Sequence, residues 1–168
     1  MTPLTDAQIR ASFVNASRRE VANANLPDLA ELRWDRLDYL GWRDRKAPLV
    51  AYVVVETDDG PTGIVLRAAD RDPMSRRQAM CAWCEDVVET DDVNLFTARR
   101  AGAVGRKGDS IGTLICGDFR CSRNVRRTPT AAEAGSDIAE VRELIVADRI
   151  AGLRRRSTTF VAEVARTR

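Results

Sequence analysis

Four cysteines constrain this chain more than any other feature of its sequence. They form two close pairs, Cys81 with Cys84 and Cys116 with Cys121, and 31 residues separate the pairs. The 168-residue chain contains no histidine. A Ser-His-Asp triad, a Cys-His pair and a histidine-ligated catalytic metal are therefore excluded. Three roles remain for the cysteines: metal binding through sulfur alone, redox chemistry, or burial as reduced thiols.

The spacing favours one metal ion bound by all four cysteines. A C-x2-C turn lets two thiolates face the same ion from one tight loop. Four sulfur ligands suit zinc in a tetrahedral site, or iron in a rubredoxin-like site. Four protein ligands also leave no position for water or substrate, so we expect a structural ion, zinc, and no catalysis. A thioredoxin-like role is disfavoured because the Cys81–Cys84 turn precedes a hairpin instead of following a strand.

The residues around the cysteines predict a zinc-finger layout. Residues 93–98 and 110–115 are apolar and indicate two strands, with a glycine-rich basic loop at Gly102–Gly108 between them. Residues 117–127 indicate a helix with Cys121 in its first turns, where the helix N-terminus would stabilise thiolates. A knuckle, a hairpin and a helix that carries the last ligand are the layout of a treble-clef finger.

The N-terminal third predicts mostly helix. Residues 5–24 have a helical apolar stripe, and Thr5 with Gln8 forms a capping box at its start. A further turn of helix is expected at Asp28–Leu32. Residues 33–47 predict an irregular or short-strand segment. It contributes three aromatic side chains to the core: Trp34, Tyr39 and Trp42.

The C-terminal part predicts a linker and two helices. Residues 128–135 have linker composition, and residues 137–156 form an amphipathic helix with Asp137 at its cap. A final short helix is expected at 160–164. The arginine run 154–156 is expected to be the solvated end of the longer helix.

The fold class that follows is α+β. Residues 49–57 and 62–67 are β-branched and apolar around a turn at 58–61, so they predict a hairpin. We expect antiparallel strands with an embedded four-cysteine treble-clef finger, flanked by N- and C-terminal helices. The expected division is an N-terminal helical segment at 1–30, a β-rich domain at 31–127 with its finger at 80–127, and a linker with C-terminal helices at 128–168.

Charge is unevenly distributed along the chain. The net charge is only +2, but residues 97–127 carry eight basic and two acidic side chains. Such a segment suits an acidic partner, nucleic acid or protein, or forms a solvated face beside the acidic residues 81–96. No apolar run reaches the roughly 20 residues of a membrane helix. The start of the chain lacks a basic region and an apolar core of a secretion signal, so the expected location is the cytoplasm.

The stretch Met80–Arg127 resembles the C-terminal treble-clef finger of bacterial elongation factor G binding proteins. This group (FBP) includes the FusB-type fusidic-acid-resistance proteins. The C-x4-C second pair makes the resemblance fairly specific. The matching motifs are Cys81-Ala82-Trp83-Cys84, Leu95-Phe96-Thr97-Ala98-Arg99-Arg100, Gly112-Thr113-Leu114-Ile115-Cys116 and Cys121.

The resemblance implies a non-enzymatic protein that binds elongation factor G at the ribosome, and no small-molecule substrate. The resistance proteins thereby help the factor leave a drug-stalled ribosome. The four cysteines match the zinc ligands. Phe96, Arg99 and Arg100 match characteristic positions of the finger and are candidates for the partner-binding surface. Phe119 and Arg123 are added by their position on the last helix.

Two alternatives stay open. Phe96 could be a core residue of the hairpin instead of an interface anchor. The finger could also bind nucleic acid, for example ribosomal RNA, with its basic side chains on phosphates. The basic residues in question are Arg99, Arg100, Arg106, Lys107, Arg123, Arg126 and Arg127.

Overall fold

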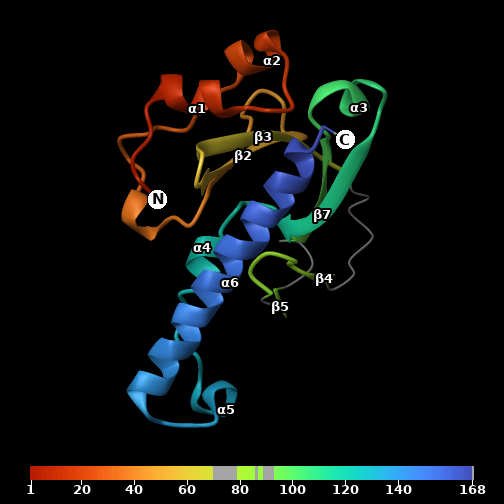
Figure 1. Cartoon of the computed structure of the whole chain (residues 1–168). Coiled ribbons are helices and arrows are strands. Elements are labelled where there is room, and N and C mark those ends of the chain that lie inside the picture. Colours follow the sequence, from red (N-terminus) through yellow and green to blue (C-terminus); the bar gives the residue numbers. More distant parts are fainter. Residues whose placement is uncertain (70–78, 86, 89–92, 168) are drawn as a thin grey trace.

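The computed structural model describes residues 1–69, 79–85, 87–88 and 93–167. Its centre is a five-stranded antiparallel sheet with the strand order β1-β2-β3-β6-β7 (Figure 1). The strands of this sheet are β1 (Leu40–Arg43), β2 (Val50–Thr57), β3 (Gly60–Ala68), β6 (Val93–Arg99) and β7 (Ser110–Cys116). A separate two-stranded ribbon consists of β4 (Ala79–Met80) and β5 (Val87–Val88).

Six α-helices and one 3-10 helix, η1, are present in the described residues. Their bounds are α1 (Asp6–Ser12), α2 (Arg18–Asn23), η1 (Trp34–Arg36), α3 (Gly102–Arg106), α4 (Cys121–Asn124), α5 (Ala131–Ala134) and α6 (Ala139–Ala165). None of these helices combines the length and the apolar character needed to span a membrane.

Both faces of the central part of β2 are buried. Ala51, Val53 and Val55 of β2 belong to one hydrophobic core, whereas Tyr52 and Val54 belong to a second. Because successive residues of a strand point to opposite faces, the two cores lie on opposite sides of the sheet. This explains why the strand is almost continuously apolar instead of alternating.

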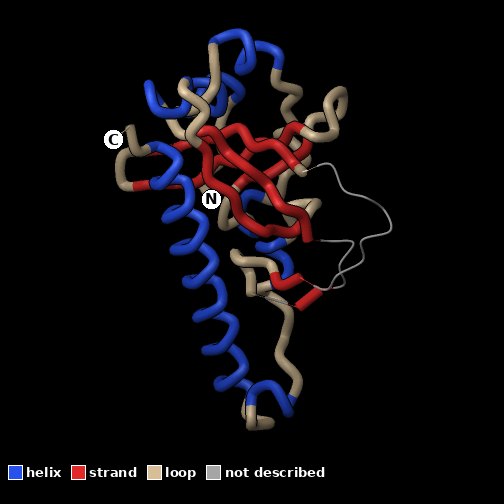
Figure 2. The backbone as a smooth tube through the Cα atoms, turned by 90° about the vertical axis from the view of Figure 1, so that its right-hand side faces the viewer, coloured by secondary structure: helices blue, strands red, loops and turns tan. Residues whose placement is uncertain are grey.

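Different elements cover the two faces. Helices α1 and α2 lie on one side, and α6 crosses the other side together with the cysteine-bearing elements (Figure 1). The C-terminal half of α6 packs on the sheet through Leu153, Val161 and Val164, which are fully buried. Its N-terminal half extends beyond the sheet and carries α5 at its far end (Figure 2).

The predicted helix at 5–24 is wrong in its continuity, because two helices occupy this stretch. The capping box of Thr5 starts α1 as expected, and a second one, from Ser17 to Glu20, starts α2. Between them Phe13 forms a bridge to Gly63 of β3, which requires extended backbone. A Cβ atom on Gly63 would lie 2.5 Å from the Ser12 hydroxyl, so this close approach requires glycine.

The expected helical turn at Asp28–Leu32 is also wrong. The Asp28 carboxylate accepts a hydrogen bond from the Ala30 amide instead of capping a helix. The following segment is irregular with a short strand, as predicted, and consists of η1 and β1. Tyr39 and Trp42 are buried and Trp34 is partly buried against the second core.

Both predicted hairpins are confirmed. Strands β2 and β3 are joined by a two-residue turn, shorter than expected, and Gly60 after it has a positive φ of 105°. Strands β6 and β7 pair over their full length. The expected loop between them contains the five-residue helix α3. A Cβ atom on Gly105 would lie 1.7 Å from the Arg100 carbonyl oxygen, so this tight turn requires glycine.

The C-terminal prediction of two helices is wrong, because α6 is one continuous helix of 27 residues. The Ser157 and Thr158 hydroxyls donate to the carbonyls of Leu153 and Arg154, so these polar residues continue the helix instead of ending it. Ile138 takes the N-cap position expected for Asp137, with no side-chain cap. The expected linker contains α5, which a Thr130–Glu133 capping box starts.

Each of the two cores contains residues from two of the three expected segments, and the segment 31–127 contributes to both. Helix α1 contacts β3, and α6 contacts β2 and β3. The division at residues 30 and 127 stays a prediction.

Candidate metal centre

Four different elements bring the cysteines together. Cys81 follows β4, Cys84 closes the knuckle turn, Cys116 ends β7 and Cys121 begins α4. The knuckle is tied to the hairpin, since the Ala82 amide donates to the Leu114 carbonyl at 2.7 Å. The knuckle therefore lies against the hairpin strand that ends in Cys116.

The four sulfur atoms fit one zinc ion. All four Sγ atoms lie within 4.8 Å of one another, and each cysteine is buried. The Cys81 and Cys121 sulfurs are 3.6 Å apart and those of Cys84 and Cys116 are 3.7 Å apart. Zn–S bonds of about 2.3 Å in a tetrahedron place the sulfurs about 3.8 Å apart. These distances are far too long for disulfides, whose S–S bond is about 2.05 Å.

The electrostatics of the cluster also favour a bound cation. Hydrogen bonds from the neighbouring thiols, first of all Cys116, hold the pKa of Cys81 well below its usual range. The same closeness, again first through Cys116, raises the pKa of Cys121. Four buried thiolates at this spacing repel one another and are ionised together only when a cation compensates their charge. The centre therefore binds zinc as four thiolates, with no position left for a substrate.

Two polar side chains support the cluster from outside. The Asn124 side-chain amide donates to the Cys116 sulfur at 3.4 Å and to the Cys84 sulfur at 3.6 Å. Tyr39 lies beside Cys121, and burial raises the pKa of its phenol well above the usual value. Sequence reasoning missed both residues. Asn124 follows Cys121 by one turn of helix, which was the available signal.

The helix after the second cysteine pair is shorter than predicted. Instead of residues 117–127, only Cys121–Asn124 are helical. The chain between Cys116 and Cys121 forms a turn in which the Phe119 amide donates to the Cys116 carbonyl and Phe119 has a φ of 60°. Backbone in the left-handed region cannot continue a helix, so the helix starts only at the last ligand.

Helix α6 braces the knuckle directly. The Arg156 guanidinium donates to the Trp83 carbonyl at 2.8 Å and pairs with Glu85 at 2.9 Å. The Trp83 ring is buried and packs between Tyr39 and Phe160. Trp83 is thus a packing residue beside the metal centre.

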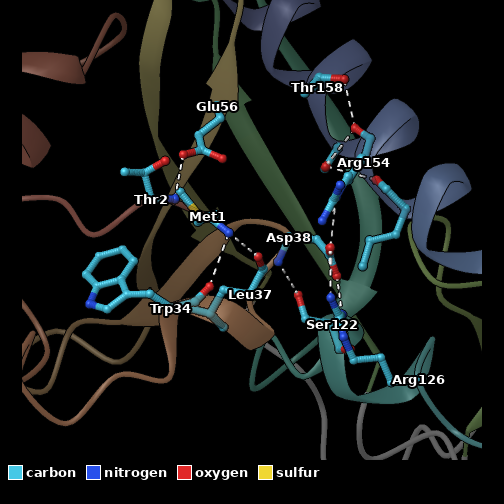
Figure 3. A network of polar contacts seen from close by, with 12 residues as sticks. Met1, Thr2, Trp34, Leu37, Asp38, Glu56, Ser122, Arg126, Arg154 and Thr158 are labelled. Atoms are coloured by element: carbon cyan, nitrogen blue, oxygen red, sulfur yellow. Dashed lines mark hydrogen bonds and ion pairs between the residues drawn. The ribbon is translucent and has the colours of Figure 1, made fainter. Parts of the chain in front are cut away.

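A buried carboxylate joins α6 to the finger. Asp38 forms ion pairs with Arg126, which follows α4, and with Arg154 of α6, where the N–O distance is 2.9 Å (Figure 3). Its amide donates to the Ser122 hydroxyl at 3.0 Å. The prediction that the arginine run 154–156 is a solvated helix end is therefore wrong. The helix continues past this run to Ala165. Within the run, Arg154 pairs with Asp38 and Arg156 contacts the knuckle.

The predicted partner-binding residues fall into two groups. Phe96 and Phe119 are buried and pack on each other with ring centroids 5.2 Å apart, so their side chains belong to the core. Arg99 pairs with Glu20 at 3.1 Å, and Arg100 pairs with Asp109 and Glu163. Arg123 is exposed. Roles of these residues in binding a partner stay predictions.

The outward face of the β6–β7 hairpin carries apolar side chains that the sequence reasoning passed over. Leu95 and Leu114 are directly opposite in the register and are 42% and 40% exposed. Met80, which precedes the knuckle, is 55% exposed. Alternation along β6 was the available signal, because an inward Phe96 places Leu95 outside.

One comparison with known proteins identifies the family. A family model described as FBP C-terminal treble-clef zinc-finger matches residues 8–164. No curated protein and no solved structure matches the chain. The matched range takes in α2, the sheet, the four cysteines and nearly all of α6, so it extends far beyond the finger itself. The chain therefore belongs to the FBP C-terminal treble-clef zinc-finger family.

Proposed function

We propose that this protein binds translation elongation factor G through the outward face of its zinc finger, in the cytoplasm and without catalysing a reaction. The family match across residues 8–164 is the observation that carries the proposal. The zinc centre supports a binding role because its four ligands close the coordination sphere, leaving the ion to shape the finger.

The hairpin face is the contact surface that the side chains favour. Leu95 and Leu114 form an exposed apolar pair, and Arg99 lies on the same face of β6 at its far end. Protein interfaces are typically anchored by apolar and arginine side chains at their centre, with polar groups around them. Phe96 contributes indirectly. Its buried ring packs in the core on the opposite face of β6 and so supports the strand that carries Leu95.

A calorimetric titration of the zinc-loaded protein with purified elongation factor G tests the proposal. We expect saturable binding at low and at physiological salt, since an apolar anchor is screened little by ions. Leu95→Asp should weaken this binding about tenfold or more, because it places a charge at the centre of the contact. Absence of binding at both salt concentrations contradicts the proposal.

Leu144→Asp is the matched control. Leu144 lies in the N-terminal half of α6, the half that protrudes, and is 71% exposed, so the same substitution adds the same charge away from the finger. We expect wild-type affinity for this variant. An equal loss in both variants would show that net charge, and not the hairpin face, determines the affinity. Fusidic-acid resistance is a separate outcome, tested by expressing the protein in a drug-sensitive host.

A further inference from the structure

A cavity of about 790 Å³ opens beside the metal centre, between η1 and α4. Its walls are dominated by arginines, and no acidic side chain lines it among the residues that the structure describes. Leu37 and Phe119 add an apolar part to its lining. We call this cavity the arginine groove, and its arginines are Arg33, Arg36, Arg120, Arg123, Arg126 and Arg127.

Four of the six arginines already have carboxylate partners outside the groove. The partners are Asp35, Asp38, Asp118 and Glu133. Arg33 and Arg123 are different, because both are exposed and neither has an ion-pair partner within the described part of the chain. They approach the groove from two separate elements, the residue before η1 and the body of α4.

We propose that the arginine groove binds the phosphodiester backbone of a single-stranded nucleic acid. A planar guanidinium donates two parallel hydrogen bonds to phosphate oxygens, so two unpaired guanidiniums on different walls can clamp neighbouring phosphates. The apolar lining of Leu37 and Phe119 suits the face of a ribose or a base between them. This site is separate from the hairpin face and does not depend on binding of the elongation factor.

Charge density favours nucleic acid over an acidic peptide. Two exposed arginines without a carboxylate partner, beside four that each pair with a carboxylate, suit a ligand with closely repeated negative charge. A nucleic-acid strand carries a phosphate on every nucleotide, whereas an ordinary protein segment has a charged residue at about one position in four.

The structure also separates the groove from the other basic residues in the segment 97–127. Arg99 and Arg100 lie at the end of β6 and form ion pairs with Glu20, Asp109 and Glu163. The nearby exposed Arg106 lines a different, smaller cavity together with them. The predicted basic surface is thus two surfaces, and only the groove gains Arg33 and Arg36 from the N-terminal part of the chain.

The test is fluorescence anisotropy of a labelled single-stranded RNA of about 12 nucleotides, a length within the usual site size of such proteins. The zinc-loaded full chain is titrated over a series of salt concentrations. We expect Arg33→Ala/Arg123→Ala to weaken binding about a hundredfold, roughly tenfold per lost contact. The slope of log affinity against log salt should fall by about 1.4, since each phosphate contact on a single strand contributes about 0.7.

Two single-site controls locate the contact. Arg18→Ala, at an exposed position of α2 outside all these cavities, should leave the affinity unchanged. Arg106→Ala should also have little effect, and a loss as large as that of the groove variant would overturn the assignment. Arg33→Ala alone keeps the test valid if substitution beside Cys121 disturbs the finger, and bound zinc and melting are measured for every variant.

Competitors identify the ligand class. If a single-stranded DNA of the same sequence competes as well as the RNA, the groove recognises the backbone alone. If the DNA competes less well, the protein also contacts the 2′-hydroxyl of the RNA. Both results support the proposal. Absence of RNA binding at low salt, or complete displacement by polyglutamate at equal charge, overturns it in favour of an acidic protein segment.

Discussion

The two faces of the sheet use the same strands but are stabilised in different ways. On one face, Phe13, Trp42 and Tyr52 form an aromatic cluster beneath α1, with Trp42 and Tyr52 stacked at 5.0 Å between ring centroids. On the other face, a metal centre and buried charges join the finger to α6. We call them the aromatic face and the zinc face.

The difference follows from the short elements that carry the cysteines. The zinc face includes β4 and β5, with two residues each, and α4, with four. Such short elements bury too little apolar surface to offset the entropy of ordering them. A structural metal supplies this stabilisation locally. On the aromatic face, the large rings of Phe13, Trp42 and Tyr52 supply buried apolar surface themselves.

Removal of zinc should produce the largest effect and should fall on the zinc face. Structural zinc contributes about 10 kcal/mol or more to folding, so Cys116→Ser or a strong chelator should unfold the finger. Metal analysis together with thermal melting measures the loss. Melting that recovers when zinc is added back to the chelated protein confirms the cause. One equivalent of zinc and unchanged melting in Cys116→Ser would contradict the role of the centre.

Loss of the arginines around Asp38 should have the next largest effect. Arg126→Met/Arg154→Met leaves a fully buried carboxylate without its ionic partners, which typically costs about 3–5 kcal/mol. Chemical denaturation measures the free energy of unfolding. Arg155→Met is the matched control, because Arg155 is exposed on the same helix and should lose almost nothing. Equal stability of the two variants would show that the buried pairs do not brace the zinc face.

Truncation of a leucine should cost more stability in the C-terminal half of α6 than in its N-terminal half. Leu153 is fully buried, so Leu153→Ala should cost about 2–5 kcal/mol. Leu144 is 71% exposed on the protruding half, so Leu144→Ala should change stability by less than about 0.5 kcal/mol. Both values come from the same denaturation experiment. A large loss in Leu144→Ala would mean that the protruding half is covered in solution.

The contrast between the faces also explains what the sequence could predict. The four-cysteine cluster and the two hairpins were predicted correctly, because cysteine spacing and β-branched strands are signals that can be recognised directly in the sequence. The break between α1 and α2 was not, because it depends on Phe13 pairing with Gly63, fifty residues away in the sequence. Capping boxes at Ser17 and Thr130 were visible signals that would have placed α2 and α5.

The supporting residues of the candidate sites were harder to predict. Asp38, Arg154 and Arg156 are distant in sequence from the cysteines, and only the packing of α6 brings them to the finger. Arg33 reaches the arginine groove in the same way, through the position of η1 beside α4. Charge counted along the chain therefore located the basic region but could not divide it into two surfaces.

The smallest expected effect compares two tyrosines, one on each face. The Tyr52 hydroxyl donates to the Asp44 carboxylate at 3.0 Å, whereas the Tyr39 hydroxyl donates to the neutral Phe119 carbonyl at 3.2 Å. Hydrogen bonds to charged groups contribute about 1.5–3 kcal/mol and neutral ones about 1 kcal/mol. Tyr52→Phe should therefore destabilise the protein about 1 kcal/mol more than Tyr39→Phe at neutral pH, as measured by denaturation.

The pH dependence of this pair sharpens the comparison. Burial, and after it the bond to Asp44, raises the pKa of Tyr52 from 10.0 to about 12. A raised pKa in the folded state means that the contribution is complete below pH 10 and is lost as the pH rises towards 12. The cost of Tyr52→Phe should therefore be constant from pH 7 to about 10 and decrease above it. A cost that already falls between pH 7 and 9 would mean that the bond on the aromatic face depends on the titration of another group.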